Sequence, residues 1–177
     1  MLTVHQTYIL EILGQLHFVE LDTLCWLMRR RFGSTRAQVE SDLRALRYLQ
    51  RLRLGENCAF LPGRKRDARM AAALEVMKRI SGRSLPTLVR GTPPYLLSFF
   101  LSSGDNALSA YKVAWTQEGR EELLRCQVEA DPFSPACVTL FLIRRVEQIP
   151  LLQGRFPAYY ALSEDGNLRF LQTPERR

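Results

Sequence analysis

Long apolar runs are missing from this chain of 177 residues, and their absence excludes one large class of proteins. The longest uncharged apolar run is YLLSFFL, residues 95–101, whereas a membrane-spanning helix needs about 20 such residues. The first residues, MLTVHQTYILEIL, show neither the basic start nor the small-residue cleavage site of a signal peptide. We therefore predict a cytoplasmic protein that has no membrane partner.

Residues that bind metals or perform catalysis are also scarce. Cys25, Cys58, Cys126 and Cys137 form no C-x-x-C pair, and the chain has only two histidines. Because a zinc site needs such ligands clustered, we predict reduced thiols and no metal. The chain also has no G-x-S-x-G, G-x-x-x-x-G-K-[ST] or G-x-G-x-x-G motif. These absences predict a protein that is not an enzyme and has no cofactor.

Positive charge is in surplus, and the surplus is unevenly placed. The formal net charge is +7, and residues 1–66 contribute eleven Lys and Arg against six Asp and Glu, a net +5. The remaining residues carry fourteen against twelve, a net +2. A basic segment beside a nearly neutral one favours a polyanionic partner for the first, although the charge could also serve solubility alone.

Hydrophobic periodicity divides the basic segment into short elements. Apolar residues at helical spacing predict the first two helices, and Phe32-Gly33 ends the second. Thr35 and Gln38 have the spacing of a capping box at the start of a third helix. After that helix the period changes to alternation around a Gly-Glu-Asn turn, which indicates a hairpin. The predicted order is a helix near 4–16, a strand at 17–19, a helix at 20–32, a helix at 34–50 and a hairpin at 51–62.

The third predicted helix has two contrasting faces. One face carries the apolar residues Val39, Leu43, Leu46 and Leu49, which we expect to pack on a core. The other face carries Arg36, Glu40, Arg44, Arg47 and Arg51, which stay in water or meet a partner. Glu40 lies one helical turn from both Arg36 and Arg44, so we expect it to pair with them.

This order of elements resembles the winged helix-turn-helix domain, over residues 3–63. In that family the third helix enters the major groove of duplex DNA and the hairpin, the wing, contacts the backbone. The resemblance implies base contacts from the start of the helix and phosphate contacts from its later turns and the wing. A homodimer would suit a two-fold DNA site. The implied DNA-binding residues are Thr35, Arg36, Glu40, Ser41, Arg44, Arg47, Arg53, Arg64 and Lys65.

The rest of the chain predicts a second unit of α+β type, after a domain boundary near residue 66. Residues 67–93 are expected to hold a helix and a linker, and the helix could also serve in a dimer or in core packing. Residues 94–177 alternate between apolar strands and helices in the order β-β-α-β-(α)-β-β, which predicts a mixed sheet with helices on it. Glu121 and Glu122 are neighbours on one predicted helix, and we expect both on a solvated face.

This order of the second unit resembles the PD-(D/E)xK, or restriction-endonuclease-like, fold. That family holds Mg²⁺ with carboxylates beside a lysine on neighbouring strands, and the candidates here are Asp105 and Lys112. Ala110 stands where the family has an acidic residue, so the resemblance implies a degenerate site without a metal. The whole arrangement also resembles replication-relaxation-like proteins of bacterial mobile elements.

These observations predict a non-enzymatic DNA-binding protein of bacterial type. The resemblances imply a transcriptional regulator or a factor in plasmid or mobile-element maintenance. Two alternatives stay open. One is an adaptor whose winged helix binds protein instead of DNA. The other is a metal-dependent nuclease with a rearranged site.

Overall fold

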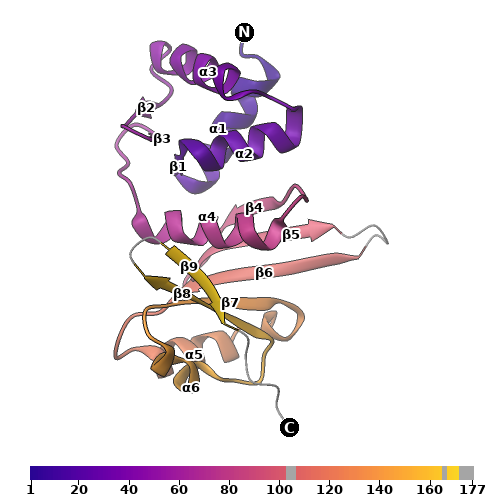
Figure 1. Ribbon diagram of the computed structural model, residues 1–177, viewed down its shortest axis with the longest axis vertical. Helices are drawn as coiled ribbons and strands as arrows, with labels where there is room; N and C mark the ends of the chain where they lie inside the picture. Colours follow the sequence, from indigo (N-terminus) through magenta and orange to yellow (C-terminus); the bar gives the residue numbers. More distant parts are fainter. Residues whose placement is uncertain (103–106, 165–166, 172–177) are drawn as a thin grey trace.

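The computed structural model describes residues 1–102, 107–164 and 167–171. The fold is of the α+β class, with a small three-stranded sheet and a larger six-stranded sheet. The N-terminal helices and the small sheet lie at one end of the molecule (Figure 1). Helix α4 lies between them and the larger sheet, and helices α5 and α6 lie at the opposite end (Figure 1).

The N-terminal elements have local causes that are visible in the sequence. Thr3 caps the first helix and Thr35 caps the third, each in a capping box with the glutamine three residues later. Gly33 ends the second helix in the left-handed conformation, with φ at 71°. The elements are α1 (Val4–Leu16), β1 (Phe18–Glu20), α2 (Leu21–Phe32), α3 (Arg36–Tyr48), β2 (Arg53–Leu54) and β3 (Cys58–Phe60).

The small sheet joins the hairpin to the strand between the first two helices. Its strand order is β1-β3-β2, and both pairings are antiparallel. Phe18 lies opposite Phe60, which in turn lies opposite Arg53. The predicted order of helix, strand, two helices and hairpin is therefore confirmed element by element.

The C-terminal part is a mixed sheet in the order β4-β5-β6-β7-β8-β9. The central pairs β6-β7 and β7-β8 are parallel, and the flanking pairs are antiparallel. Parallel neighbours need crossover connections, which contain α5 and α6. The elements are α4 (Ala68–Ser81), β4 (Thr87–Arg90), β5 (Tyr95–Ser102), β6 (Leu108–Trp115), α5 (Glu121–Glu129), η1 (Ser134–Ala136), β7 (Val138–Ile143), η2 (Val146–Gln148), α6 (Ile149–Leu152), β8 (Ala158–Glu164) and β9 (Asn167–Leu171).

Residues 67–93, predicted as a helix and a linker, take part in the fold. Helix α4 buries Met70, Leu74 and Met77 and contacts β5, β6, β9 and α2, so core packing is its observed role. Strand β4 was not predicted, although it forms the edge of the large sheet by pairing with β5. It is only four residues long, and Leu88 is its single buried side chain. A segment that short shows no measurable period in the sequence.

The two parts of the chain share one hydrophobic core. A single cluster of buried side chains runs from Leu13 on α1 through Leu74 on α4 to Phe99 on β5. The guanidinium of Arg90 on β4 donates to the carbonyl of Leu16 at 3.1 Å. The expected burial of α3 holds for Val39, Leu43 and Leu46 but is wrong for Leu49, which is 51% exposed. The helix ends at Tyr48, so the apolar face does not extend to Leu49.

The opposite face of the large sheet carries a second core under α5 and α6. Here the expectation of a solvated Glu121 is wrong, because this side chain is buried, whereas Glu122 is exposed. Gln148 donates to the Glu121 carboxylate at 2.8 Å, and this bond lowers the pKa of Glu121 together with a bond from its own backbone N–H. The Gln148 side-chain oxygen accepts the backbone N–H groups of Arg144 and Arg145. Glu121 therefore anchors the turn after β7.

Candidate nucleic-acid interface

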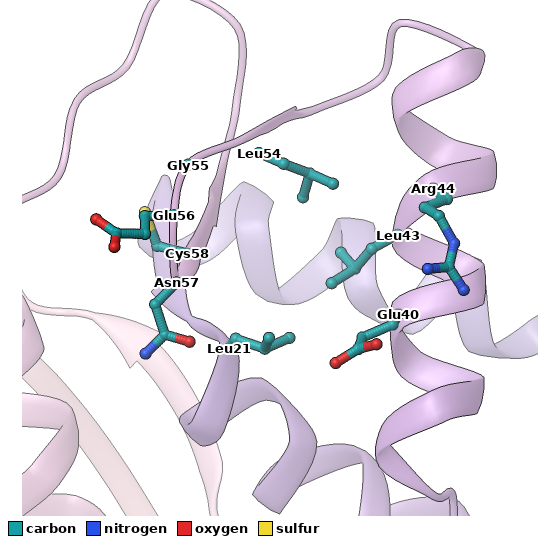
Figure 2. Close-up of a pocket in the computed structure, with 9 residues that line it drawn as sticks. All are labelled: Leu21, Glu40, Leu43, Arg44, Leu54, Gly55, Glu56, Asn57 and Cys58. Carbon is teal, nitrogen blue, oxygen red and sulfur yellow. The ribbon is translucent and has the colours of Figure 1, made fainter.

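A gap between α3 and the tip of the hairpin is the central feature of the N-terminal surface. It is a cavity of about 190 Å³ with an apolar floor, and Glu40 and Arg44 lie on its α3 side. Leu43 and Glu40 project from α3 toward the hairpin, Leu54 projects back, and Glu56 points away from the gap (Figure 2). The lining residues are Leu21, Glu40, Leu43, Arg44, Leu54, Gly55, Glu56, Asn57 and Cys58.

A second groove adjoins the first on the other side of Leu54. It has a volume of about 530 Å³ and lies between the end of α3 and strands β2 and β3. Arg47 and Arg53 line it, together with Gln50, Leu52, Leu54, Phe60 and Pro62. Because Leu54 lines both hollows, Arg44, Arg47 and Arg53 all gather around the hairpin strand β2.

The first turn of α3 is electrostatically different from the later turns. The Arg36 guanidinium contacts Glu40 and Asp22 of α2, each at 3.0 Å. The hydrogen bond with Glu40 raises the pKa of Arg36 further, so this group stays charged while its charge is compensated. The expected pairing of Glu40 with Arg36 is confirmed. Its expected pairing with Arg44 is not found among the ion pairs of the described residues.

Five other predicted site residues keep their positive charge uncompensated. They are exposed, and no carboxylate of the described residues lies within 4.0 Å of any of them. In the same basic run, Arg66 is instead bound to Glu20 at 2.7 Å. We call this set the five unpaired cations: Arg44, Arg47, Arg53, Arg64 and Lys65.

The two hydroxyl residues predicted to contact bases have different positions. The Thr35 hydroxyl accepts the backbone N–H of Gln38, so its acceptor capacity is used to start the helix. Ser41 is exposed on α3, one residue after Glu40. Sequence reasoning missed Asn57 and Glu56 of the hairpin tip, which lie at the gap opposite Arg44, with the Glu56 side chain turned outward (Figure 2). Their only signal in the sequence was the Gly-Glu-Asn turn itself.

The site considered for nuclease chemistry is incomplete in the described residues. Lys112 lies on β6 and bonds Asp131, which follows α5, at 2.5 Å. Asp105, its predicted partner, lies outside the described residues. Within the described ranges no three or more His, Cys, Asp or Glu residues gather into a possible metal site.

Comparisons with models of protein families, with curated proteins and with solved structures gave no match to this chain. Among the described residues, no helix is long and apolar enough to cross a membrane.

Proposed function

We propose that this chain is a non-enzymatic protein that binds duplex DNA through α3 and the β2–β3 hairpin. One observation carries the proposal: Arg44, Arg47 and Arg53 line two adjoining hollows between α3 and the hairpin, and no carboxylate of the described residues lies within 4.0 Å of them. In this proposal residues 3–63 form a winged helix-turn-helix unit. Its biological role would be in transcription or in the maintenance of a plasmid or mobile element.

Each part of the surface has a distinct task in this proposal. Arg47, Arg53, Arg64 and Lys65 neutralise backbone phosphates, which supply most of the affinity of such proteins. Arg44 lies in the middle of the exposed face of α3 and reads a base edge, since arginine is the commonest reader of guanine. Thr35, Arg36 and Glu40 instead fix the start of the helix, through the cap and the ion pairs described above.

Protein binding is a second candidate, and a specific observation favours it. Tyr48 is 87% exposed and Leu49 is 51% exposed, side by side at the end of α3. Aromatic and apolar side chains are enriched at the cores of protein interfaces. An adaptor would use these residues, together with Asp22 and Glu40, and would not need the unpaired arginines.

A mobility-shift experiment separates the two candidates. The probe is a pool of random duplexes of about 20 base pairs, long enough for two half-sites, at low salt. We expect the full chain to shift the pool, and we expect Arg44→Ala to weaken binding to its preferred duplex by roughly 5- to 150-fold, as for the loss of a base-reading arginine.

Two matched variants serve as controls for this experiment. Arg169→Ala removes an exposed arginine from β9 of the large sheet and should leave binding unchanged. Tyr48→Ala should also leave DNA binding largely intact. If no duplex shifts at low salt, or if Arg169→Ala weakens binding as much as Arg44→Ala, the DNA-binding proposal is wrong.

A further inference from the structure

A separate cleft lies on the large sheet, far along the chain from α3. It has a volume of about 390 Å³ and opens between β5, β6 and the C-terminal end of α5. Lys112 alternates along β6 with Tyr111 and Val113, which pack in the core beneath α4. Its side chain therefore projects to the opposite sheet face, where α5 lies. The residues used below are Tyr95, Lys112, Gln127, Asp131 and Phe133, all of which line the cleft.

A partly buried ion pair forms the polar wall of this cleft. The Lys112 ammonium and the Asp131 carboxylate lie 2.5 Å apart, with side chains 17% and 15% exposed. The Tyr95 hydroxyl donates to the same carboxylate oxygen at 2.9 Å. The backbone N–H of Phe133 donates to the other oxygen at 3.0 Å. The Asp131 carboxylate thus accepts three hydrogen bonds, one from Lys112 and two from groups outside the pair.

The charge states of these groups are well defined. Burial by itself would raise the pKa of Asp131, but the hydrogen bonds from Lys112, Phe133 and Tyr95 outweigh it and lower that pKa. Burial and the bond to Asp131 raise the pKa of Tyr95. At neutral pH Asp131 is therefore a carboxylate and Tyr95 a neutral phenol.

Aromatic rings form the second wall. The Lys112 nitrogen lies 4.8 Å from the centre of the Tyr95 ring and 5.5 Å from that of Phe133. Tyr95 is buried, but Phe133 is 67% exposed at the mouth of the cleft. A large exposed aromatic ring beside a cation is a stacking surface for a flat ligand.

Unused hydrogen-bonding capacity narrows the choice of ligand. An ammonium carries three N–H donors, so Lys112 can still serve an acceptor after binding Asp131. Each carboxylate oxygen accepts twice, so the Asp131 oxygen that binds Phe133 can accept once more. The wall has no net charge and hence does not select a polyanion by charge. It matches a flat ring that has an acceptor and a donor on adjacent positions of one edge.

We propose that this cleft binds a single unpaired nucleobase, stacked on Phe133 with its hydrogen-bonding edge against Lys112 and Asp131. Every base has adjacent donors and acceptors on its pairing edge, so little preference among bases follows. The base comes either from a single strand or from a free nucleotide. If the base belongs to a single strand, the proposal rests on the proposed DNA binding; if it belongs to a free nucleotide, it does not.

The test compares two single strands that differ only in their bases. One is an oligothymidine of about twelve nucleotides, and the other is an abasic strand of equal length and charge. Binding to the full chain is followed by fluorescence anisotropy. We expect the thymidine strand to bind more tightly, and Phe133→Ala to remove about 5- to 150-fold of that difference, as base–aromatic stacking would. Excess thymidine monophosphate is then added to the bound thymidine strand. If it displaces the strand, the cleft also accepts free nucleotides.

Control variants keep the result interpretable. Tyr159→Ala removes another exposed aromatic, from β8 on the α4 side of the sheet, and should preserve the difference between strands. Arg44→Ala, on α3 and away from the cleft, should leave the difference between the strands unchanged. Gln127→Ala changes the cleft without touching the buried pair, and should reduce only the thymidine advantage. An advantage that survives Phe133→Ala overturns the inference, and so does equal binding of the two strands together with no binding of thymidine monophosphate to the unaltered chain; neither outcome affects duplex binding.

Discussion

The five unpaired cations make a quantitative prediction about salt. Four of these cations are assigned to phosphates, and if Arg47, Arg53, Arg64 and Lys65 each neutralise one, the slope of log affinity against log salt is about −3.6, at about −0.9 per contact. Affinity for duplex DNA should then fall roughly 150-fold between about 50 mM and about 200 mM salt. Arg36 and Arg66 already have carboxylate partners, so they are left out of the count.

Single substitutions measure how much each cation contributes to this slope. Arg47→Ala and Arg53→Ala should each reduce its magnitude by about 0.9, and the double variant by about 1.8. Arg169→Ala on the large sheet should leave it unchanged. The measurement is a set of anisotropy titrations of one labelled duplex across the salt range.

Two patterns of slopes would contradict this prediction. A slope shallower than about −1 means that at most one phosphate is contacted. That result is incompatible with the proposed interface, in which several cations around the hairpin contact phosphates. A normal slope that is insensitive to Arg47→Ala and Arg53→Ala, yet falls in Arg169→Ala, would move the interface to the large sheet.

Three further predictions concern stability. Leu46→Ala, at a fully buried position on α3, should lower the free energy of unfolding by about 2–5 kcal/mol, whereas Leu49→Ala should change it by under about 0.5 kcal/mol, both measured by urea denaturation. Thr35→Ala should cost about 0.5–2 kcal/mol through loss of the α3 cap, and Thr35→Ser should restore most of it; equal effects of both variants would exclude capping. Because the folded pKa of Glu121 is lowered, its contribution to stability is complete above the ordinary carboxyl pKa and disappears as pH falls through the folded value. Glu121→Ala should therefore destabilise the chain by about 1–3 kcal/mol at neutral pH, by leaving the side-chain N–H donor of Gln148 without its acceptor, and should flatten the acid side of a stability–pH curve.

The N-terminal elements were predictable because their causes are local. Capping boxes, the left-handed Gly33 and the change from helical to alternating period are all contained within a few residues. The sequence also predicted the Arg36–Glu40 pair, which is one helical turn apart. It could not predict that Asp22 shares Arg36, because the loop that brings α2 against α3 is a tertiary feature.

In the C-terminal part, the missed features depend on contacts between distant residues. The partner of Lys112 is Asp131, which follows helix α5. The expected spacing applied to residues on neighbouring strands, so it could not identify a partner after a helix. Glu121 was expected in water because adjacent acidic residues usually lie there, and only the approach of Gln148 makes its burial tolerable. Strand β4 is stabilised by its pairing with β5. Its four residues, between a proline and a glycine, contain no pattern from which that pairing could be predicted.

The hydrophobic cluster that runs from α1 to β5 has a consequence for how this molecule melts. Since the N-terminal helices and the large sheet bury one another's side chains, neither half can lose its packing alone. Heating should give a single endotherm whose calorimetric and van't Hoff enthalpies agree. The hydrogen bond from Arg90 of β4 to Leu16 of α1 adds a polar contact between the same two parts, so it should be lost in the same transition.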